Sequence, residues 1–259
     1  MTKNVVAEAK TTAIADAALF EGLPTGLEYV KSSDLLIPRL TILQGLSPQV
    51  IPSKPEFIKG ATVGDFCDVG VGQVAKELVL VPVAFRKEFL RWAPRTSGKG
   101  LVNNYGSDDS ILKQTTKDDR NRNIMNDGSG DYIAETYQFF CINLSMNNRL
   151  SFYPLASTNL KKARGWLTLL TQEELVGKNG KFLAPMFYRA WNVQSVPASN
   201  ASGDWYAPKF SPAQPIMELF PDGSLLKACV DFQKQINEGL VKGDLAQDEE
   251  QPDDKNKAM

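Results

Sequence analysis

The sequence predicts a mainly β domain that carries two α-helices. Short apolar and β-branched runs separated by Gly, Pro and Asn dominate the chain, whereas sustained helical periodicity is confined to residues 159–175 and 223–238. The chain has 259 residues, 42% of them apolar, so it can bury a sizeable core. No apolar run approaches the roughly 20 residues that cross a bilayer. We therefore expect a cytoplasmic protein with no membrane partner.

Composition divides the chain into three segments. Residues 1–32 open with an alanine-rich stretch that lacks a sustained apolar face, and we expect them to be flexible. Residues 243–259 carry six acids and two lysines, a charge of −4 that leaves +3 on residues 1–242. This tail has no aromatic residue and contains Pro252, so it should be disordered. The folded domain is expected to span residues 33–242.

The folded domain opens with strands. Residues 33–44, SDLLIPRLTILQ, alternate in a strand-like pattern, and Pro38 suits a strand edge or start. After a proline-rich loop, residues 62–92 predict a strand, a glycine-rich turn and the long strand KELVLVPVAFRKEFLRW. Residues 96–130 are rich in Gly, Asn, Asp and Ser. Connections of this length are usually functional or disordered.

A hairpin and a helix follow this long connection. Two aromatic-rich runs on either side of an Asn-Asn turn predict a β-hairpin over residues 131–156. Ser157 or Thr158 is placed to cap a helix over residues 159–175. The apolar residues that share one face of this helix are Leu160, Ala163, Leu167 and Leu170.

Two more strands and a second helix complete the domain. Residues 184–196 and 203–211 are expected to pair as a hairpin, and residues 223–238 as a helix. The helix residues expected to face the body are Leu226, Cys229, Val230 and either Phe232 or Gln233. A helix between the third and fourth strands is the order of the OB-fold, a five-stranded Greek-key barrel that binds oligonucleotides. We therefore expect an OB-fold-like Greek-key barrel with long insertions.

The residue types available for catalysis are restricted. The chain has no histidine, which removes the commonest general base and a frequent metal ligand. Cys67, Cys141 and Cys229 lie far apart without metal-binding spacing, so buried free thiols are expected. We expect a protein that is not an enzyme and that uses no metal or cofactor.

Three stretches combine aromatic rings with cations, as single-stranded nucleic acid binding requires. The first is FRKEFLRWAPR, where alternation places Phe85, Lys87, Phe89 and Arg91 on one face of a strand. The second is FYRAWNVQS, where we expect Phe187, Arg189 and Trp191 to share a face, and the third surrounds Trp205. A basic, solvated edge strand is the alternative interpretation. The candidate contacts are Lys87, Phe89, Arg91, Trp92, Arg95, Tyr188, Arg189, Trp205, Tyr206 and Lys209.

Several strings together resemble the single-stranded DNA-binding proteins of tailed bacteriophages. They are IPRLTILQGLSPQV, RKEFLRW, the pattern W-x-V…N-x-x-G-x-W-Y from Trp191 to Tyr206, and the acidic tail. The resemblance spans residues 35–220. It implies an OB-fold groove that coats single-stranded DNA during replication and recombination in the host cytoplasm. It also implies a tail that docks phage or host replication proteins through Asp248, Glu249, Glu250, Asp253 and Asp254. The tail ends in Lys257-Ala258-Met259 rather than in a bulky apolar residue, which puts that docking in doubt.

Two other classes of function remain open. A β-rich chain with long loops also suits a phage virion or assembly component. A metal-dependent nuclease would need Asp65 and Asp68 together with a Glu-x-Lys pair, and no such pair follows on a suitable strand. The sequence leaves open whether the chain forms a homo-oligomer and whether DNA or RNA is preferred.

Overall fold

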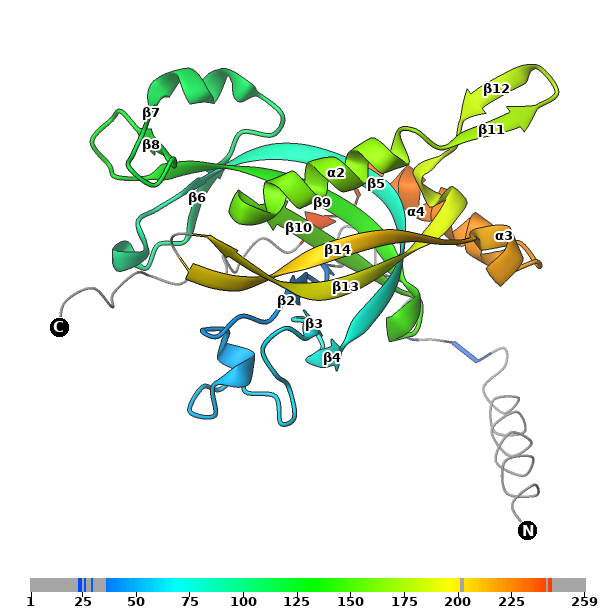
Figure 1. Ribbon diagram of the computed structural model, residues 1–259, viewed down its shortest axis with the longest axis horizontal. Helices are drawn as coiled ribbons and strands as arrows, with labels where there is room; N and C mark the ends of the chain where they lie inside the picture. Colours follow the sequence, from blue (N-terminus) through cyan, green and yellow to red (C-terminus); the bar gives the residue numbers. More distant parts are fainter. Residues whose placement is uncertain are drawn as a thin grey trace, which may run out of the picture. The chain divides into compact units, whose positions relative to one another are not determined.

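The computed structural model describes residues 23, 24, 26, 29, 36–200, 203–240, 242 and 243. The chain divides into two compact units, Met1–Leu35 and Leu36–Met259, and all described strands and helices lie in the second. This unit is mainly β, as the sequence predicts, and its main sheet curls into a half-barrel (Figure 1). Apart from residues 23, 24, 26, 29 and 243, the expected flexible segment 1–32 and the acidic tail 243–259 lie outside the described residues.

Five antiparallel strands form the body of the half-barrel. In order of pairing they are β10 (Arg149–Ala156), β9 (Tyr132–Asn143), β5 (Glu77–Trp92), β13 (Arg189–Asn200) and β14 (Gly203–Pro215). Along the chain, β5, β9 and β10 come first, a helix follows, and β13 and β14 come last. The structure therefore has the strand order and the central helix of an OB-fold-like barrel.

A small three-stranded sheet connects the two edges of the half-barrel. It consists of β2 (Leu40–Ile42), β3 (Phe66–Asp68) and β4 (Gln73–Ala75). At the β10 edge, the amide of Phe152 donates to the carbonyl of Pro38 at 2.9 Å. At the β14 edge, the side chain of Gln44 donates to the carbonyl of Tyr206 at 3.0 Å and accepts from its amide at 2.9 Å. Both edge strands therefore gain backbone hydrogen bonds that a flat sheet would leave to water.

The long connection between β5 and β9 folds as a lobe, defined as residues 93–131. Its strands are β6 (Leu101–Asn104), β7 (Thr115–Lys117) and β8 (Asn123–Met125), and a 3-10 helix covers Asp109–Gln114. Phe89 of β5 packs beneath the lobe with Ile111 and Met125. The lobe thus has its own small apolar cluster.

Two helices cover opposite faces of the main sheet. On one face, α2 (Leu160–Leu170) buries Trp166, whose ring stacks on Phe210 of β14 with centroids 4.1 Å apart. On the other face, α4 (Ser224–Asn237) buries Leu225, Cys229, Phe232 and Ile236. Each fully buried apolar side chain of this size contributes about 1.5–3 kcal/mol. Both faces of the sheet are therefore core.

The remaining elements are short. A helix, α3, spans Ile216–Leu219 before α4, and β1 (Leu36–Ile37) pairs in parallel with β15 (Lys242–Gly243). A hairpin of β11 (Glu174–Gly177) and β12 (Gly180–Leu183) projects from the body after α2 (Figure 1).

Two expectations near α2 are wrong. The helix ends at Leu170 instead of continuing to residue 175, because the next residues turn and enter β11. The string GKNG supplies the tight turn of this hairpin. In addition, no side chain caps α2, because Ser157–Asn159 forms a 3-10 turn that leads into it.

Two expectations about side-chain direction are also wrong. Met186–Tyr188 is a 3-10 turn and not strand, so Phe187 packs in the α4 cluster whereas Trp191 packs in the α2 cluster. On α4 the buried stripe includes Leu225, and Leu226 and Val230 are exposed.

The predicted hairpin of β9 and β10 is confirmed, and Asn147 and Asn148 at its turn both have positive φ.

Candidate nucleic-acid interface

The alternation predicted for the long strand β5 is confirmed. Phe85 and Lys87 lie opposite Phe139 and Tyr137 of β9, on the face that α2 covers. Phe89 follows on the same face beneath the lobe. Phe85, Lys87 and Phe89 therefore share one face of β5 as predicted, but α2 covers the end with Phe85 and the lobe covers the end with Phe89.

Two of the predicted stacking rings are core residues. Phe89 is 1% exposed and Trp92 is 6% exposed. Phe89 fills the lobe cluster, and Trp92 lies opposite Tyr132 on the other face of the sheet. A base cannot stack on a ring that the protein already covers, so neither residue is a nucleic-acid platform.

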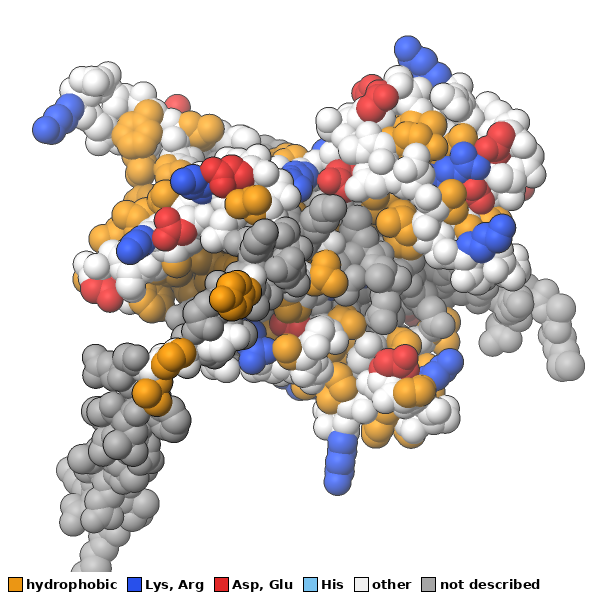
Figure 2. All heavy atoms as spheres, turned by 180° about the vertical axis from the view of Figure 1, so that it is seen from behind, with side chains coloured by type: hydrophobic (Ala, Val, Ile, Leu, Met, Phe, Trp, Pro, Cys, Tyr) orange, Lys and Arg blue, Asp and Glu red, His pale blue; other side chains and the backbone are white. Residues whose placement is uncertain are grey.

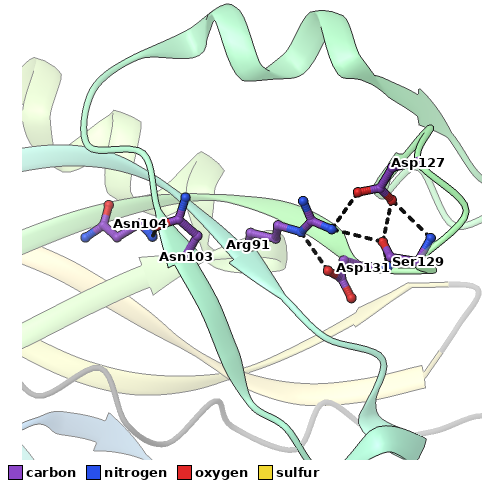
Figure 3. A network of polar contacts seen from close by, with 6 residues as sticks. All are labelled: Arg91, Asn103, Asn104, Asp127, Ser129 and Asp131. Atoms are coloured by element: carbon purple, nitrogen blue, oxygen red, sulfur yellow. Dashed lines mark hydrogen bonds and ion pairs between the residues drawn. The ribbon is translucent and has the colours of Figure 1, made fainter.

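The predicted phosphate contact Arg91 is already bound within the protein. Its guanidinium donates to Asp131 at 2.6 Å, to Asp127 at 2.7 Å and to the hydroxyl of Ser129 at 3.1 Å (Figure 3). Hydrogen bonds to Tyr105 and Asp131 raise the pKa of Arg91. Because two carboxylates neutralise this cation, Arg91 ties the lobe to β5 and is not available to a phosphate.

The same contacts lower the pKa of two acidic groups in this network, Asp127 and Tyr105. Hydrogen bonds from the hydroxyl and amide of Ser129, supplemented by Arg91, lower the pKa of Asp127 from 3.8 to about 2. Hydrogen bonds with Asn103 and then with Arg91 lower the pKa of Tyr105. Asp127 therefore remains ionised near neutral pH as a partner of Arg91.

The other predicted contacts do not join β5 in one groove. Arg189 pairs with Glu173 at 2.6 Å, and its guanidinium lies over the ring of Tyr188. Trp205 lies opposite Ala198, nine residues further along β13, or roughly 30 Å away at the usual rise of a strand. The expectation of a single interface is wrong, because the antiparallel strands carry these residues to opposite ends of the barrel.

The residues at the Trp205 end have different surroundings. The ring of Tyr206 closes on the backbone of Gly64, where a Cβ atom would lie only 2.8 Å from it. Tyr206 therefore helps to close the barrel at the β14 edge. Trp205 is half-buried, and Lys209 is exposed on the same strand. Arg95 begins the 3-10 helix Arg95–Ser97, and its side chain lies outside the described part of the chain, as do the five tail acids.

One row of side chains does combine cations with an aromatic ring at the surface. Arg164 of α2 lies over the ring of Tyr137 at 5.8 Å, and its Nε donates to the Tyr137 hydroxyl at 3.4 Å. Lys87 is directly opposite Tyr137 on β5, and Lys161 is one helical turn from Arg164. We call these four residues, Lys87, Tyr137, Lys161 and Arg164, the cationic strip. Two of these residues, Lys87 and Tyr137, lie on the sheet, and the other two lie on α2.

The two α2 cations of the strip are exposed, Lys87 and Tyr137 are half-buried, and the strip carries net positive charge. Arg164 is 56% exposed and pairs with Glu135 at 3.0 Å. Lys87 is half-buried with its Nζ 5.0 Å from the Phe89 ring centre, and Lys161 is exposed. Neither lysine has an ion-pair partner among the described residues. Three cations therefore face one carboxylate.

Sequence reasoning found only Lys87 of this strip. Tyr137 lies in a hairpin whose pairing with β5 spans the lobe, so its position opposite Lys87 could not be read from the chain. Lys161 and Arg164 gave a signal, since their spacing places them together on the solvent side of the predicted helix. That spacing alone does not connect the helix with β5.

Helix α4 restricts where a ligand of this barrel can lie. In OB-folds, the second and third strands and the connection between the first and second bind oligonucleotides. The outer face of β9 and β10 carries Phe140 and Phe152, and α4 covers both. The lobe is the connection between the first and second strands, and it borders the cationic strip.

The acids of the nuclease alternative do not form an open site. Asp65 accepts from Lys76 at 2.6 Å, and Asp68 is fully buried, which raises its pKa above 3.8. No three His, Cys, Asp or Glu side chains within the described residues are placed to hold a metal ion. Cys67, Cys141 and Cys229 are buried thiols that form no disulfide, as expected. None of the helices in the described part of the chain is long and apolar enough to span a bilayer.

The fold and the strip define a small OB-fold-like β-barrel protein with a cationic surface beside its central helix. A family model described as Pam3 phage gp34-like protein matches residues 6–242, and the chain belongs to this family of phage proteins. No curated protein and no solved structure matches the chain.

Proposed function

We propose that this phage protein binds single-stranded DNA without catalysis, in phage DNA replication or recombination. The observation that carries the proposal is the cationic strip, where Arg164 lies over the half-buried Tyr137 ring and Lys87 lies opposite Tyr137 on the neighbouring strand. Proteins that bind single strands combine cations for the phosphates with rings on which bases stack. The strip supplies both on one short path across the sheet.

Charge supports this choice of ligand. Residues 36–243, which exclude the acidic tail after Gly243, contain 24 Lys and Arg against 19 Asp and Glu, a net charge of +5. A polyanion gains affinity from such a surface through release of its counterions. Arg164 shares its charge with Glu135, so Lys87 and Lys161 are the cations most available to phosphates.

The strip suits a single strand better than a duplex. Its ring packs against the α2 cluster, and Phe89, two residues beyond Lys87 on β5, packs beneath the lobe. Phe85 packs on this ring with centroids 5.1 Å apart and Arg164 lies over it, so an unpaired base would stack in place of the exposed Arg164 guanidinium, which a stacked base pair cannot displace. We expect little sequence preference, because every base has a face that stacks.

Fluorescence anisotropy of labelled oligo(dT) and of a matched duplex tests the proposal. Oligo(dT) should bind more tightly, and Tyr137→Ala should weaken it by about 1–3 kcal/mol if bases stack on this ring. Tyr137→Phe keeps the ring and is the matched control, which should bind nearly as the wild type. Equal affinity for duplex and single strand, or equal binding by the Ala and Phe variants, would contradict the proposal.

One observation favours the second candidate, a virion or assembly component. The hairpin of β11 and β12 exposes apolar side chains at the end of the molecule that carries α3 (Figure 2). If the protein binds no oligo(dT) at low salt, this exposed apolar hairpin would favour a role as a virion or assembly component.

A further inference from the structure

The hairpin of β11 and β12 is attached to the barrel only at its base. The amide of Ala184 donates to the carbonyl of Glu173 at 2.8 Å, and the Glu173 carboxylate pairs with Arg189. Within the described residues, the two strands pair with each other and with no other strand. Isolated two-stranded hairpins are marginally stable in water, and a third strand stabilises them.

The hairpin carries apolar side chains into solvent. Val176 is 81% exposed, Leu183 is 56% exposed and Phe182 is 50% exposed. Figure 2 shows hydrophobic side chains along a projecting arm, with a basic side chain at its tip. The Phe182 ring also covers Gly177, where a Cβ atom would lie 3.1 Å from it. Clustered apolar exposure of this kind marks interaction surfaces.

We propose that β11 pairs in antiparallel fashion with β11 of a second copy of this chain, around a twofold axis through Val176. The register follows from the sequence of the strand. With Val176 opposite Val176 of the second copy, Glu174 lies opposite Lys178, and symmetry makes this pair twice. Residues 174 and 176 alternate onto the same face of β11, and the long side chain of Lys178 extends from the adjoining turn. The two hairpins together form a four-stranded sheet.

Charge complementarity selects a second copy as the partner. Glu174 begins β11 and Lys178 begins the turn that follows it, at equal distances along the chain from Val176, so the two charges meet their partners only when the copies are antiparallel. Within one copy, Glu174 already pairs with Lys181 of β12 at 3.2 Å, which fixes the carboxylate on the proposed face. The strand contact is small, and interfaces of this class are weak. We expect a reversible dimer, and this inference does not depend on DNA binding.

Disulfide formation tests the proposed axis. A cysteine at Val176 would face its symmetry mate, so Val176→Cys should form a covalent dimer under mild oxidation. The native cysteines, Cys67, Cys141 and Cys229, are buried and should not interfere. Val230→Cys, on exposed helix α4, is the control for random collision. A Val176→Cys protein that stays monomeric, or that cross-links no faster than the control, overturns the proposal.

Charge reversal tests the register independently. By sedimentation equilibrium, Glu174→Lys alone and Lys178→Glu alone should each raise the dimer dissociation constant about tenfold, because each places two like-charge pairs across the axis. The double variant should restore dimerisation. Lys181→Ala removes only the pair within one copy and controls for a loosened hairpin. Failure of the double variant to recover, while Lys181→Ala dimerises normally, excludes this register.

Discussion

Replacement of Arg91 by alanine should destabilise the barrel much more than replacement of Arg164. The Arg91 side chain is 17% exposed and holds Asp131, whose side chain is 10% exposed. Removal of Arg91 leaves that buried carboxylate without its cation, at a cost of about 1–3 kcal/mol. The pair with Asp127, which is 44% exposed, adds at most about 1 kcal/mol. We therefore expect a total loss of about 2–3 kcal/mol.

The comparison with Arg164 makes the test specific. Arg164 and Glu135 are 56% and 23% exposed, so their ion pair is worth about 0–1 kcal/mol. In a domain of this size, each kcal/mol shifts Tm by about 2–4 °C. Calorimetry should show a fall of about 5–10 °C for Arg91→Ala and less than about 4 °C for Arg164→Ala. Equal shifts, or weaker oligo(dT) binding by Arg91→Ala than by Arg164→Ala, would refute the structural role of Arg91.

Three further predictions concern other parts of the molecule. The pKa of Asp127 is lowered from 3.8 to about 2, so the stability that ionised Asp127 contributes is complete above pH 4 and is lost as the pH falls towards 2. Over this pH range, the Tm of the wild type should therefore fall further than the Tm of Asp127→Asn. Phe89→Ala should cost about 3 kcal/mol by urea unfolding, because it empties the lobe cluster, and the folded fraction should bind oligo(dT) with unchanged affinity. Truncation after Gly243 removes six acids that compete for a cationic surface, so oligo(dT) affinity should rise at low salt and change little at high salt; identical salt curves would leave the tail without this role.

The elements of the barrel could be predicted from local patterns. Asn147-Asn148 marked the turn of one hairpin, the run of residues 77–92 marked the longest strand, and the helix fell between the third and fourth strands. The turn, the strand and the helix position depend on residues that are close together in the chain, so a single sequence is sufficient to predict them. The GKNG turn was overlooked because the helical periodicity before it was extended too far.

The candidate site depends on pairing across long separations, and the sequence does not show it. Lys87 meets Tyr137 through a pairing that spans the lobe, and Arg164 reaches the same ring from α2. The sequence also does not show which sheet residues are buried, because α2 and α4 cover opposite faces of the sheet. A mixed aromatic and basic strand therefore does not show which ring is covered, and Trp92 and Phe89 were misassigned for that reason.

The salt dependence of oligo(dT) affinity tests the proposed DNA-binding strip most directly. Removal of one cation that binds a phosphate of a single strand should reduce the slope of log affinity against log salt by about 0.7. The double variant Lys87→Ala/Lys161→Ala should therefore lower the slope by about 1.4, whereas Lys227→Ala, an exposed lysine of α4, should leave it unchanged. A double variant with the wild-type slope and affinity would contradict binding at this strip.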